Sequence, residues 1–150
     1  LPPYYRNLGK RIVKSPKLYF FDTGLLCYLL GMHAPKDVAN YYQLGAVFEN
    51  LVVAERKKAQ AHLGSPIKQF YYRDSNQIEI DLLEEEGNTI RLIEIKAART
   101  ILDKQFKNMK TISRLIKERD VDRYLIYGGE EKAYHYQEVQ ICSWKDLGRV

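Results

Sequence analysis

The stretch from Gln77 to Lys96 decides the fold, and its sequence is QIEIDLLEEEGNTIRLIEIK. Apolar and polar residues alternate on both sides of Gly87-Asn88, a pair that is typical of a tight turn between antiparallel strands. If this pair is a two-residue turn, Glu86 faces Thr89 and the register of the whole hairpin follows. The sequence therefore predicts a β-hairpin of known register.

In this register the polar residues gather on one face, where Asp81 lies opposite Glu94 and Glu79 lies opposite Lys96. Two facing carboxylates need a compensating cation, which Lys96 or, more strongly, a divalent metal can supply. Oxygen ligands of this kind suit Mg²⁺ or Mn²⁺. We expect the opposite face to be the core face, and its residues are Ile78, Ile80, Leu82, Ile93 and Ile95.

The composition bounds the class of protein. A chain of 150 residues corresponds to one domain, or to one domain with a short extension. No apolar run approaches the roughly 20 residues of a membrane span, and no signal peptide opens the chain, so we expect no membrane partner. Two cysteines without metal-ligand spacing fit a reducing cytoplasm. A net charge of +5 permits an anionic partner such as nucleic acid without requiring one.

The N-terminal part is weakly patterned and rich in Lys and Arg up to Lys17. It is either a solvated connector or an arm that contacts phosphates. Asp22 can cap a short helix from Thr23 to about Leu30. We assign residues 1–35 to a linker with this short helix and residues 36–150 to the main domain. Because the chain does not begin with Met, we expect it to come from a longer protein.

A strong helix is predicted from about Leu44 to Leu63, with apolar residues at helical spacing. Glu49 lies off the apolar stripe of this helix. It either pairs with Arg56 or directs a third carboxylate at the polar face of the hairpin.

A second helix is predicted within Ala97 to Asp120. Its basic residues recur at helical spacing and form one stripe, which is either a solvated face or a surface for sugar-phosphate contacts. The members of the stripe are Lys107, Lys110, Arg114 and Lys117.

Three further strands are predicted around the hairpin. Ile67 to Arg73 precedes it, and Arg123 to Tyr127 suits a parallel crossover after the second helix. Tyr134 to Cys142 has the pattern of an edge strand, and Trp144 begins a short closing helical segment. The order from the first long helix is helix, three strands, helix, strand, which predicts an α/β domain with a mixed sheet flanked by helices.

The polar residues of the hairpin could do hydrolytic chemistry. Glu94 and Lys96 are two residues apart and share a face, so a metal held by Asp81 and Glu94 would have an ammonium group beside it. Lys96 would orient the attacking water or stabilise the charged phosphate, and Glu49 would contribute through water. No Gly-rich loop of the P-loop type is present, so the chain does not itself bind ATP in that way.

This pattern resembles the PD-(D/E)xK nuclease superfamily: Asp81 is followed after twelve residues by Glu94-x-Lys96, and Glu49 lies in a preceding helix. Ile80 stands where the family motif has Pro. The resemblance implies a restriction-endonuclease-like core of order α-β-β-β-α-β and Mg²⁺-dependent cleavage of DNA phosphodiesters. It also implies that Glu49, Asp81, Glu94 and Lys96 are the catalytic residues, with the three carboxylates as metal ligands.

A narrower resemblance covers nearly the whole chain. It is similar to a domain of unknown function at the C-terminus of many prokaryotic P-loop (AAA+-like) ATPases, which implies an ATP-binding module of the same polypeptide as partner. The motifs that carry it are Lys14-x-Pro16-Lys17-Leu18-Tyr19-Phe20-Phe21-Asp22-Thr23-Gly24-Leu25, Gly45-Ala46-x-Phe48-Glu49-Asn50, Tyr72-Arg73-Asp74, Glu79-x-Asp81 and Glu94-Ile95-Lys96-Ala97.

Three functions stay open from the sequence. The first is a metal-dependent DNA endonuclease module, which the retained carboxylates and Lys96 favour. The second is a non-catalytic nuclease-like domain that binds nucleic acid or a protein and regulates its ATPase, which the modest net charge favours. The third is a small α/β domain whose acidic face meets a protein partner. The sequence also leaves an oligomer open.

Overall fold

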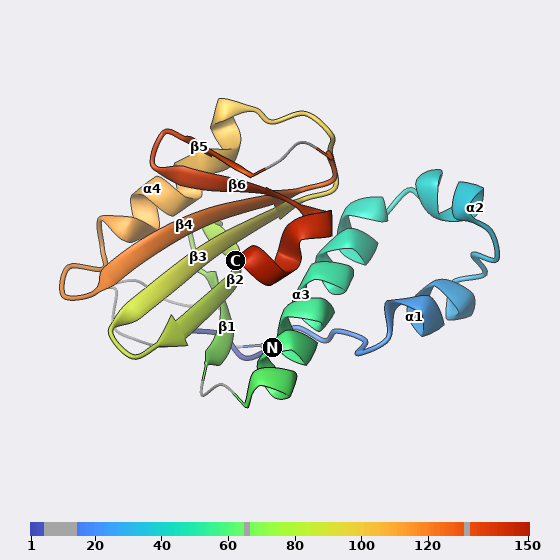
Figure 1. The fold of residues 1–150 in the computed structure, drawn as a ribbon, viewed down its shortest axis with the longest axis horizontal. Coiled ribbons are helices and arrows are strands. Elements are labelled where there is room, and N and C mark those ends of the chain that lie inside the picture. The colour runs from blue at the N-terminus through green and yellow to red at the C-terminus, as the bar shows by residue number, and fades with distance from the viewer. Residues whose placement is uncertain (5–14, 65–66, 131–132) are drawn as a thin grey trace.

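The computed structural model of the chain describes residues 1–4, 15–64, 67–130 and 133–150. A six-stranded mixed sheet forms the centre, with strand order β1-β2-β3-β4-β6-β5. One helix, α3, covers one face of the sheet, and α4 covers the other (Figure 1). The strands are β1 (Lys68–Arg73), β2 (Glu79–Glu86), β3 (Thr89–Lys96), β4 (Asp120–Tyr127), β5 (Tyr134–Tyr136) and β6 (Val139–Ser143).

The first long helix, α3, runs from Leu44 to Leu63 and confirms the prediction. It ends at Gly64, whose φ of 61° is the left-handed conformation that favours glycine at a helix terminus. Its buried side packs on the sheet through one apolar cluster, so that α3 is fixed against β2, β3, β4 and β6. The buried members of this cluster are Val52, Val53, Leu82, Ile93, Ile95, Ile126 and Cys142.

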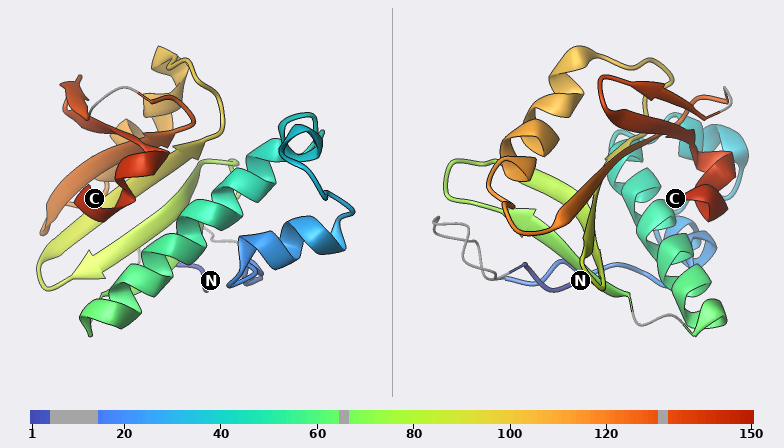
Figure 2. Two further views of the ribbon diagram at one scale, coloured as in Figure 1. Left: turned by 45° about the vertical axis from the view of Figure 1, so that its right-hand side comes forward. Right: turned by 60° about the vertical axis from the view of Figure 1, so that its left-hand side comes forward.

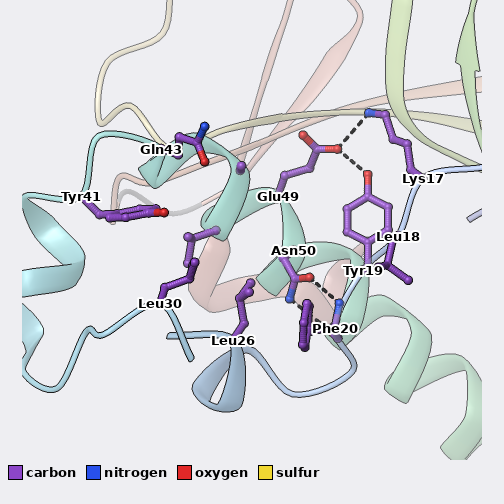
Figure 3. Close-up of a pocket in the computed structure, with 12 residues that line it drawn as sticks. Lys17, Leu18, Tyr19, Phe20, Leu26, Leu30, Tyr41, Gln43, Glu49 and Asn50 are labelled. Carbon is purple, nitrogen blue, oxygen red and sulfur yellow. Dashed lines mark hydrogen bonds and ion pairs between the residues drawn. The ribbon is translucent and has the colours of Figure 1, made fainter. Parts of the chain in front are cut away.

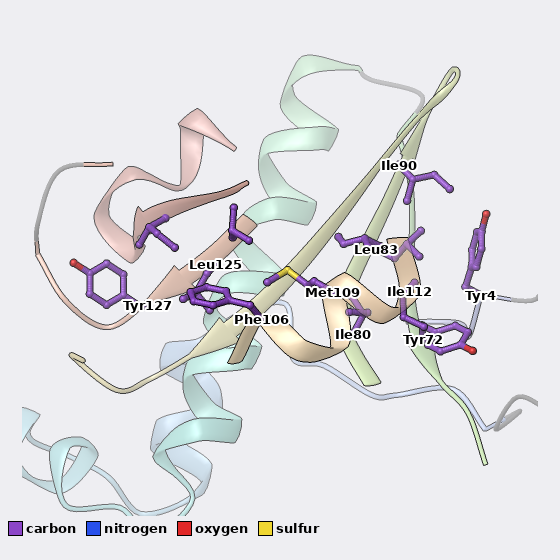
Figure 4. Packing of buried hydrophobic residues seen from close by; sticks show 13 residues of the cluster. Tyr4, Tyr72, Ile80, Leu83, Ile90, Phe106, Met109, Ile112, Leu125 and Tyr127 are labelled. Carbon is purple, nitrogen blue, oxygen red and sulfur yellow. The ribbon is translucent and has the colours of Figure 1, made fainter. Parts of the chain in front are cut away.

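A second apolar cluster lies on the other face of the sheet, beneath α4 (Figure 4). A short 3₁₀ segment, η1 (Asp103–Phe106), leads into α4 (Lys107–Ser113). The predicted helix from Ala97 to Asp120 is therefore wrong in length. The hydroxyls of Thr111 and Ser113 donate to main-chain carbonyls one turn earlier, which weakens a helix near its end.

The hairpin has the predicted register, from Glu86 opposite Thr89 to Leu82 opposite Ile93. The prediction of a single core face is wrong. Leu82 packs in the cluster beneath α3, whereas Ile80 and Leu83 pack in the cluster beneath α4. Both faces are buried because a helix covers each of them, as is usual where strands run parallel.

The C-terminal part completes the sheet. β4 runs parallel to β3, which confirms the predicted crossover, and β6 runs parallel to β4. The predicted single edge strand from Tyr134 to Cys142 is instead a hairpin of β5 and β6. Gln137 and Glu138 both have positive φ, 46° and 64°, and form the tight turn that separates these strands. The 3₁₀ segment η2 (Trp144–Arg149) follows β6 and lies beside α3.

The N-terminal part begins beside the sheet and leads out beyond it. Pro3 pairs with Tyr71 of β1, and the Lys17 N–H donates to the carbonyl of Leu1. The short helices α1 (Thr23–Leu29) and α2 (Pro35–Ala39) then extend to one side of α3 (Figure 2). The Asp22 carboxylate accepts from the Leu25 N–H, which confirms the predicted cap. Four of the basic residues of the predicted arm, Arg6, Lys10, Arg11 and Lys14, lie outside the described residues.

None of the helices in the described ranges combines the length and the apolar character needed to cross a membrane.

Candidate active site

The hairpin ladder breaks at Asp81, and the break creates the candidate site. Backbone pairing between β2 and β3 extends to Leu82 opposite Ile93. Beyond this point the Oδ2 atom of Asp81 accepts the Ile95 N–H at 2.8 Å, in the place of a main-chain carbonyl. The buried carboxylate is thereby held between the two strands.

Glu94 and Lys96 of β3 complete the centre of the site. The Nζ atom of Lys96 lies 2.7 Å from Oε1 of Glu94 and 3.4 Å from Oδ2 of Asp81. The other oxygen of Glu94, Oε2, is buried and has no hydrogen-bond partner. A buried carboxylate oxygen without a donor is costly, so it marks a place where a cation or a proton would be stabilised.

Burial and mutual repulsion shift the protonation equilibria of these groups. Burial, together with the charge of Asp81, raises the pKa of Glu94 to about 7 against the opposing effect of Lys96. Burial also raises the pKa of Asp81, and Glu49 adds to that shift. Burial lowers the pKa of Lys96, but both carboxylates outweigh this effect and the net pKa is raised. Lys96 is therefore a permanent cation, and Glu94 can exchange a proton near neutral pH.

Glu49 reaches the same site from α3. Its Oε1 atom accepts hydrogen bonds from the Tyr19 hydroxyl and from Nζ of Lys17, the latter at 3.0 Å (Figure 3). The alternative pairing of Glu49 with Arg56 is wrong, because Arg56 binds Glu84 instead. Burial and the charge of Glu49 raise the pKa of Tyr19, so its hydroxyl stays protonated and donates.

Asn50 holds Lys17 and Tyr19 in place. Its side-chain Oδ1 accepts the Phe20 N–H at 2.7 Å, and its Nδ2 donates to the Phe20 carbonyl at 3.0 Å. The same amide donates to the Thr23 hydroxyl at 2.9 Å. Because Asn50 directly follows Glu49, one turn of α3 supplies both a carboxylate of the site and the contact that fixes its partners.

Glu79 lies at the edge of the site. Its Oε1 atom is 2.5 Å from Nζ of Lys17, and its Oε2 atom is 3.7 Å from Nε of Arg73. The predicted pairing of Glu79 with Lys96 is therefore wrong, because β1 and the N-terminal segment supply the cations. We call the six groups Glu49, Glu79, Asp81, Glu94, Lys17 and Lys96 the acidic cluster. Its four carboxylates exceed its two ammonium groups by two charges, or by one if the outer Arg73 is counted.

The acidic cluster fits a hard divalent cation in its chemistry. Among the residues that the structure describes, no group of three or more His, Cys, Asp or Glu side chains is arranged to hold a metal ion. Mg²⁺, however, commonly binds through only one or two carboxylates and keeps several waters. Asp81 and the unpartnered Oε2 of Glu94 offer such a pair, next to an excess of negative charge. The metal thus stays a prediction that these residues can accommodate.

The predicted basic stripe is interrupted. Lys107 and Lys110 lie on α4, but the helix ends at Ser113, so Arg114 follows it and Lys117 lies beyond it. All four side chains are exposed. Arg123 of β4 joins Lys110 and Arg114 around a shallow cavity of about 430 Å³. A basic surface therefore exists, although it is composed of helix and strand residues.

The start of α4 adjoins the acidic cluster, because Nδ2 of Asn108 donates to the main-chain carbonyl of Glu79 at 3.1 Å. Lys107, the neighbour of Asn108, therefore lies at the end of α4 that is nearer to the cluster.

Sequence reasoning placed Glu49, Asp81, Glu94 and Lys96 but did not assign a role in the site to Lys17, Tyr19 or Asn50. Lys17 and Tyr19 belong to a segment about thirty residues before Glu49 in the chain. The pattern of the hairpin does not predict where this segment lies in the fold. The one signal in the sequence was the position of Asn50 beside Glu49 on a helix that was otherwise apolar on that side.

Comparison with known proteins gives the following matches. The family model described as Domain of unknown function (DUF4143) matches residues 44–147, and a second, Domain of unknown function (DUF8612), matches residues 1–36. Over 137 residues the chain is 33% identical to an uncharacterized protein of Mycobacterium tuberculosis and to one of Mycobacterium bovis. The match covers 88% of this chain but 28% of each relative, so the chain spans less than a third of their length. The predicted similarity to a domain of unknown function is confirmed, and the association with an ATPase stays a prediction.

Proposed function

The chain belongs to the DUF4143 family, and on that premise we propose that it is a metal-dependent nuclease module that hydrolyses DNA phosphodiesters. The observation that carries the proposal is the convergence of Asp81, Glu94 and Lys96 where the hairpin ladder breaks. The order α3, β1, β2, β3, α4, β4 is also that of the restriction-endonuclease-like core implied by the resemblance. The short α4 and the preceding η1 are departures from a regular second helix.

In this proposal the carboxylates of Asp81 and Glu94 hold a Mg²⁺ or Mn²⁺ ion, and Glu49 contributes from α3. When bound, such an ion lowers the pKa of a water and offsets the charge that grows on the phosphate. Without it the excess negative charge of the acidic cluster would repel a DNA backbone. The cation is thus required for substrate binding as well as for hydrolysis.

The chain's own residues have distinct roles. Lys96 is a cation with a raised pKa, so its ammonium group donates to the attacking water or to a phosphate oxygen. Before the metal binds, Glu94, with a pKa of about 7, can hold a proton near neutral pH, and this proton would leave when its Oε2 atom becomes a metal ligand. Lys17 and Tyr19 hold Glu49 through hydrogen bonds and keep its carboxylate aligned.

Metal binding is tested first by calorimetry with Mg²⁺ and Mn²⁺. We expect wild type to bind either ion and Asp81→Asn to lose measurable binding. Asp122→Asn is the matched control, because Asp122 is an exposed carboxylate on β4, two strands away from β2 in the sheet. Equal binding by wild type and Asp81→Asn would show that the metal site is wrongly assigned.

Cleavage is tested with junction, flap and linear DNA in the presence of Mg²⁺. We expect wild type to cut at least one of these substrates and Lys96→Ala to lose the activity. Lys145→Ala is the control, because Lys145 is an exposed lysine in η2 that pairs with Glu130 and lies over the Trp144 ring, neither of which belongs to the acidic cluster. Absence of cutting by the full-length protein, with ATP present, would favour the second candidate function.

DNA binding by the basic residues is tested through its salt dependence. Neutralising Lys107, Lys110 and Arg114 together should reduce the slope by about one unit for each phosphate that these side chains neutralise in wild type. An unchanged slope would assign these exposed side chains to a solvated face.

The second candidate is a non-catalytic domain that binds nucleic acid or a protein and regulates an ATPase module of the same polypeptide. One observation favours it: Lys17 and Lys96 already pair with all four carboxylates of the acidic cluster. In that case residues 1–35 would serve as the linker to a cytoplasmic P-loop ATPase, and residues 36–150 would be the regulatory domain. ATP hydrolysis by the full-length protein should then change when the domain binds DNA, with no product of cleavage.

A further inference from the structure

A cavity of about 450 Å³ adjoins the acidic cluster on the side of α1 (Figure 3). Its walls come from the segment 17–20, from α1, from the residues that precede α3 and from the first two turns of α3. Lys17, Tyr19 and Glu49 belong both to the cavity and to the site described above. A molecule in the cavity would therefore touch the groups that hold Glu49.

The two ends of the cavity differ in chemistry. Away from Glu49 the walls are apolar and aromatic, with Leu26, Leu30, Val47 and Tyr41. Near Glu49 they carry the Glu49 carboxylate together with the Lys17 ammonium group and the Tyr19 hydroxyl, which both donate to it. With the proposed cation offsetting the charge of the acidic cluster, a ligand with a flat apolar body and a phosphate at one end matches this division.

Gln43 adds polar groups to the cavity that have no partner among the interactions described. It precedes α3 at the capping position, but its side chain makes no capping hydrogen bond. The side chain is exposed, so both its carbonyl oxygen and its two N–H donors can contact a ligand. The first turn of α3 contains no acidic residue, and Glu49 in the second turn is the carboxylate among the lining residues.

We propose that this cavity binds the unpaired nucleotide next to the phosphodiester that is cut. The base lies against Tyr41 and the leucines, and the amide of Gln43 contacts its edge. This inference rests on the proposed nuclease function, because only a phosphate at the acidic cluster places the next nucleotide here. Residues 43 and 49 are about 9 Å apart along α3, at 1.5 Å per residue, which suits adjacent parts of one strand.

The cavity selects single-stranded over duplex DNA. A base within a duplex is stacked and paired, and removing it costs the free energy of unstacking and unpairing, whereas a base in a flap or a gap is already available. Stacking on an aromatic ring is possible for every base, so we expect little sequence preference. The substrate class of the module is accordingly DNA with an unpaired nucleotide at the cut site.

Binding is tested with the full chain in Mg²⁺ and with a single-stranded oligonucleotide that carries fluorescent 2-aminopurine and hydrolysis-resistant phosphorothioate linkages. We expect the protein to change the fluorescence at least twofold, and the matching duplex to give no change. Ala46→Phe fills the cavity from an exposed position on α3 and should weaken binding tenfold or more. Ala61→Phe makes the same change at an exposed position in the last turn of α3 and should alter the affinity less than twofold.

A second pair of variants tests the contact without filling the cavity. Gln43→Ala should weaken binding of the oligonucleotide severalfold, and Gln43→Glu should weaken it further because it places a carboxylate beside the DNA. Equal affinities of wild type, Ala46→Phe and both Gln43 variants would overturn the proposal. The proposal would also be overturned if wild type formed a dimer that Ala46→Phe does not form, and if wild type left the fluorescence of the oligonucleotide unchanged. The occupant of the cavity would then be a second copy of the chain.

The cleavage arm separates this proposal from the nuclease function. With Mg²⁺, Ala46→Phe should lower the ratio of flap to linear duplex cutting at least tenfold, and Ala61→Phe should leave the ratio unchanged. If wild type cuts flaps and Ala46→Phe cuts them equally well, the cavity proposal fails and the nuclease function stands. If wild type cuts nothing but the fluorescence arm gives the expected differences, the nuclease function fails and the cavity retains its nucleotide-binding role.

Discussion

Two charged clusters lie between α3 and the sheet, and they differ in how completely they are satisfied. The first is the acidic cluster around Glu49 and Asp81. The second, which we call the closed pair, consists of Arg56 and Glu84. Glu49 and Arg56 are seven residues apart on α3, about two helical turns, and Asp81 and Glu84 are three apart on β2. The same two elements thus build both clusters.

The closed pair uses its polar atoms fully. Two guanidinium nitrogens of Arg56 donate to the two oxygens of Glu84, at 3.1 Å and 2.6 Å. The third nitrogen donates to the main-chain oxygens of Leu147 and Val150, and Gln69 donates to Glu84. Arg56 and Glu84 are only 7% and 1% exposed. Arg91 adds a more distant cation, 3.9 Å from Oε2 of Glu84, so no negative charge is in excess and no oxygen is left unpartnered. This is typical of an architectural contact.

The acidic cluster has the opposite properties. It has an excess of negative charge, and Oε2 of Glu94 is buried without a donor. Natural proteins tolerate such unfavourable groups mainly where they bind or react. The comparison therefore suggests that the closed pair stabilises the fold and that the acidic cluster reduces stability in exchange for function.

The largest expected effect is on the closed pair. Arg56→Met should lower the free energy of unfolding by about 3–5 kcal/mol, because it leaves the buried Glu84 with only the amide of Gln69 and the more distant Arg91. Urea denaturation followed by circular dichroism measures this change. Lys58→Met is the control, since Lys58 on the same helix pairs with Glu55 at the surface and should contribute less than about 1 kcal/mol. Similar losses in the two variants would remove the distinction between architectural and surface pairs.

The next effect concerns the contact that joins the N-terminal segment to the acidic cluster. Asn50→Ala should lower stability by about 1–3 kcal/mol, because the N–H and carbonyl of Phe20 lose their partner. Hydrogen exchange should also become faster at the Phe20 amide. Asn40→Ala, at an exposed position after α2, should change stability by less than about 0.5 kcal/mol. Unchanged exchange at Phe20 would show that other contacts hold Lys17 and Tyr19 in place.

The third effect is a pH dependence that only the acidic cluster should show. The folded pKa of Glu94 is raised from 4.5 to about 7, so the folded state holds the proton more tightly than the unfolded state. The stability from this group is complete below pH 4.5 and is lost as the pH rises through 7. In EDTA, wild type should lose on the order of 1–3 kcal/mol relative to Glu94→Gln between these pH values. Parallel stability curves for the two proteins would contradict the raised pKa.

Local patterns predicted the parts of the site that lie on regular elements. Helical spacing gave the bounds of α3, and Gly87-Asn88 gave the hairpin register, which brings Asp81, Glu94 and Lys96 together. The place of Glu49 beside them came from the family resemblance. The sequence also indicates that both faces of the hairpin are buried, because the apolar residues Leu82-Leu83 and Leu92-Ile93 are adjacent and so point to opposite faces. The prediction of a single core face rested on the alternation of apolar and polar residues and did not use these adjacent pairs.

Long-range contacts could not be predicted in the same way. Arg56 could have paired with Glu49 or with any exposed acid, and only the packing of α3 on β2 selects Glu84. Lys17 enters the site because Asn50 binds the main chain of Phe20, which belongs to the same segment as Lys17 and lies thirty residues before Asn50. Such choices depend on which elements meet in space, a property of the tertiary fold and not of a local pattern.

The smallest effect has the opposite sign to the first. Asp81→Asn should raise stability in EDTA by about 0.5–1 kcal/mol, because it removes one charge from a cluster with an excess of them. The substituted side chain keeps an oxygen that can accept the Ile95 N–H, and its new N–H groups can donate to Glu94. Glu84→Gln, the same kind of change in the closed pair, should instead destabilise the protein because it leaves Arg56 without a counter-charge. Urea denaturation of both variants in EDTA measures the two signs, and a loss of stability in both would place the acidic cluster with the architectural contacts.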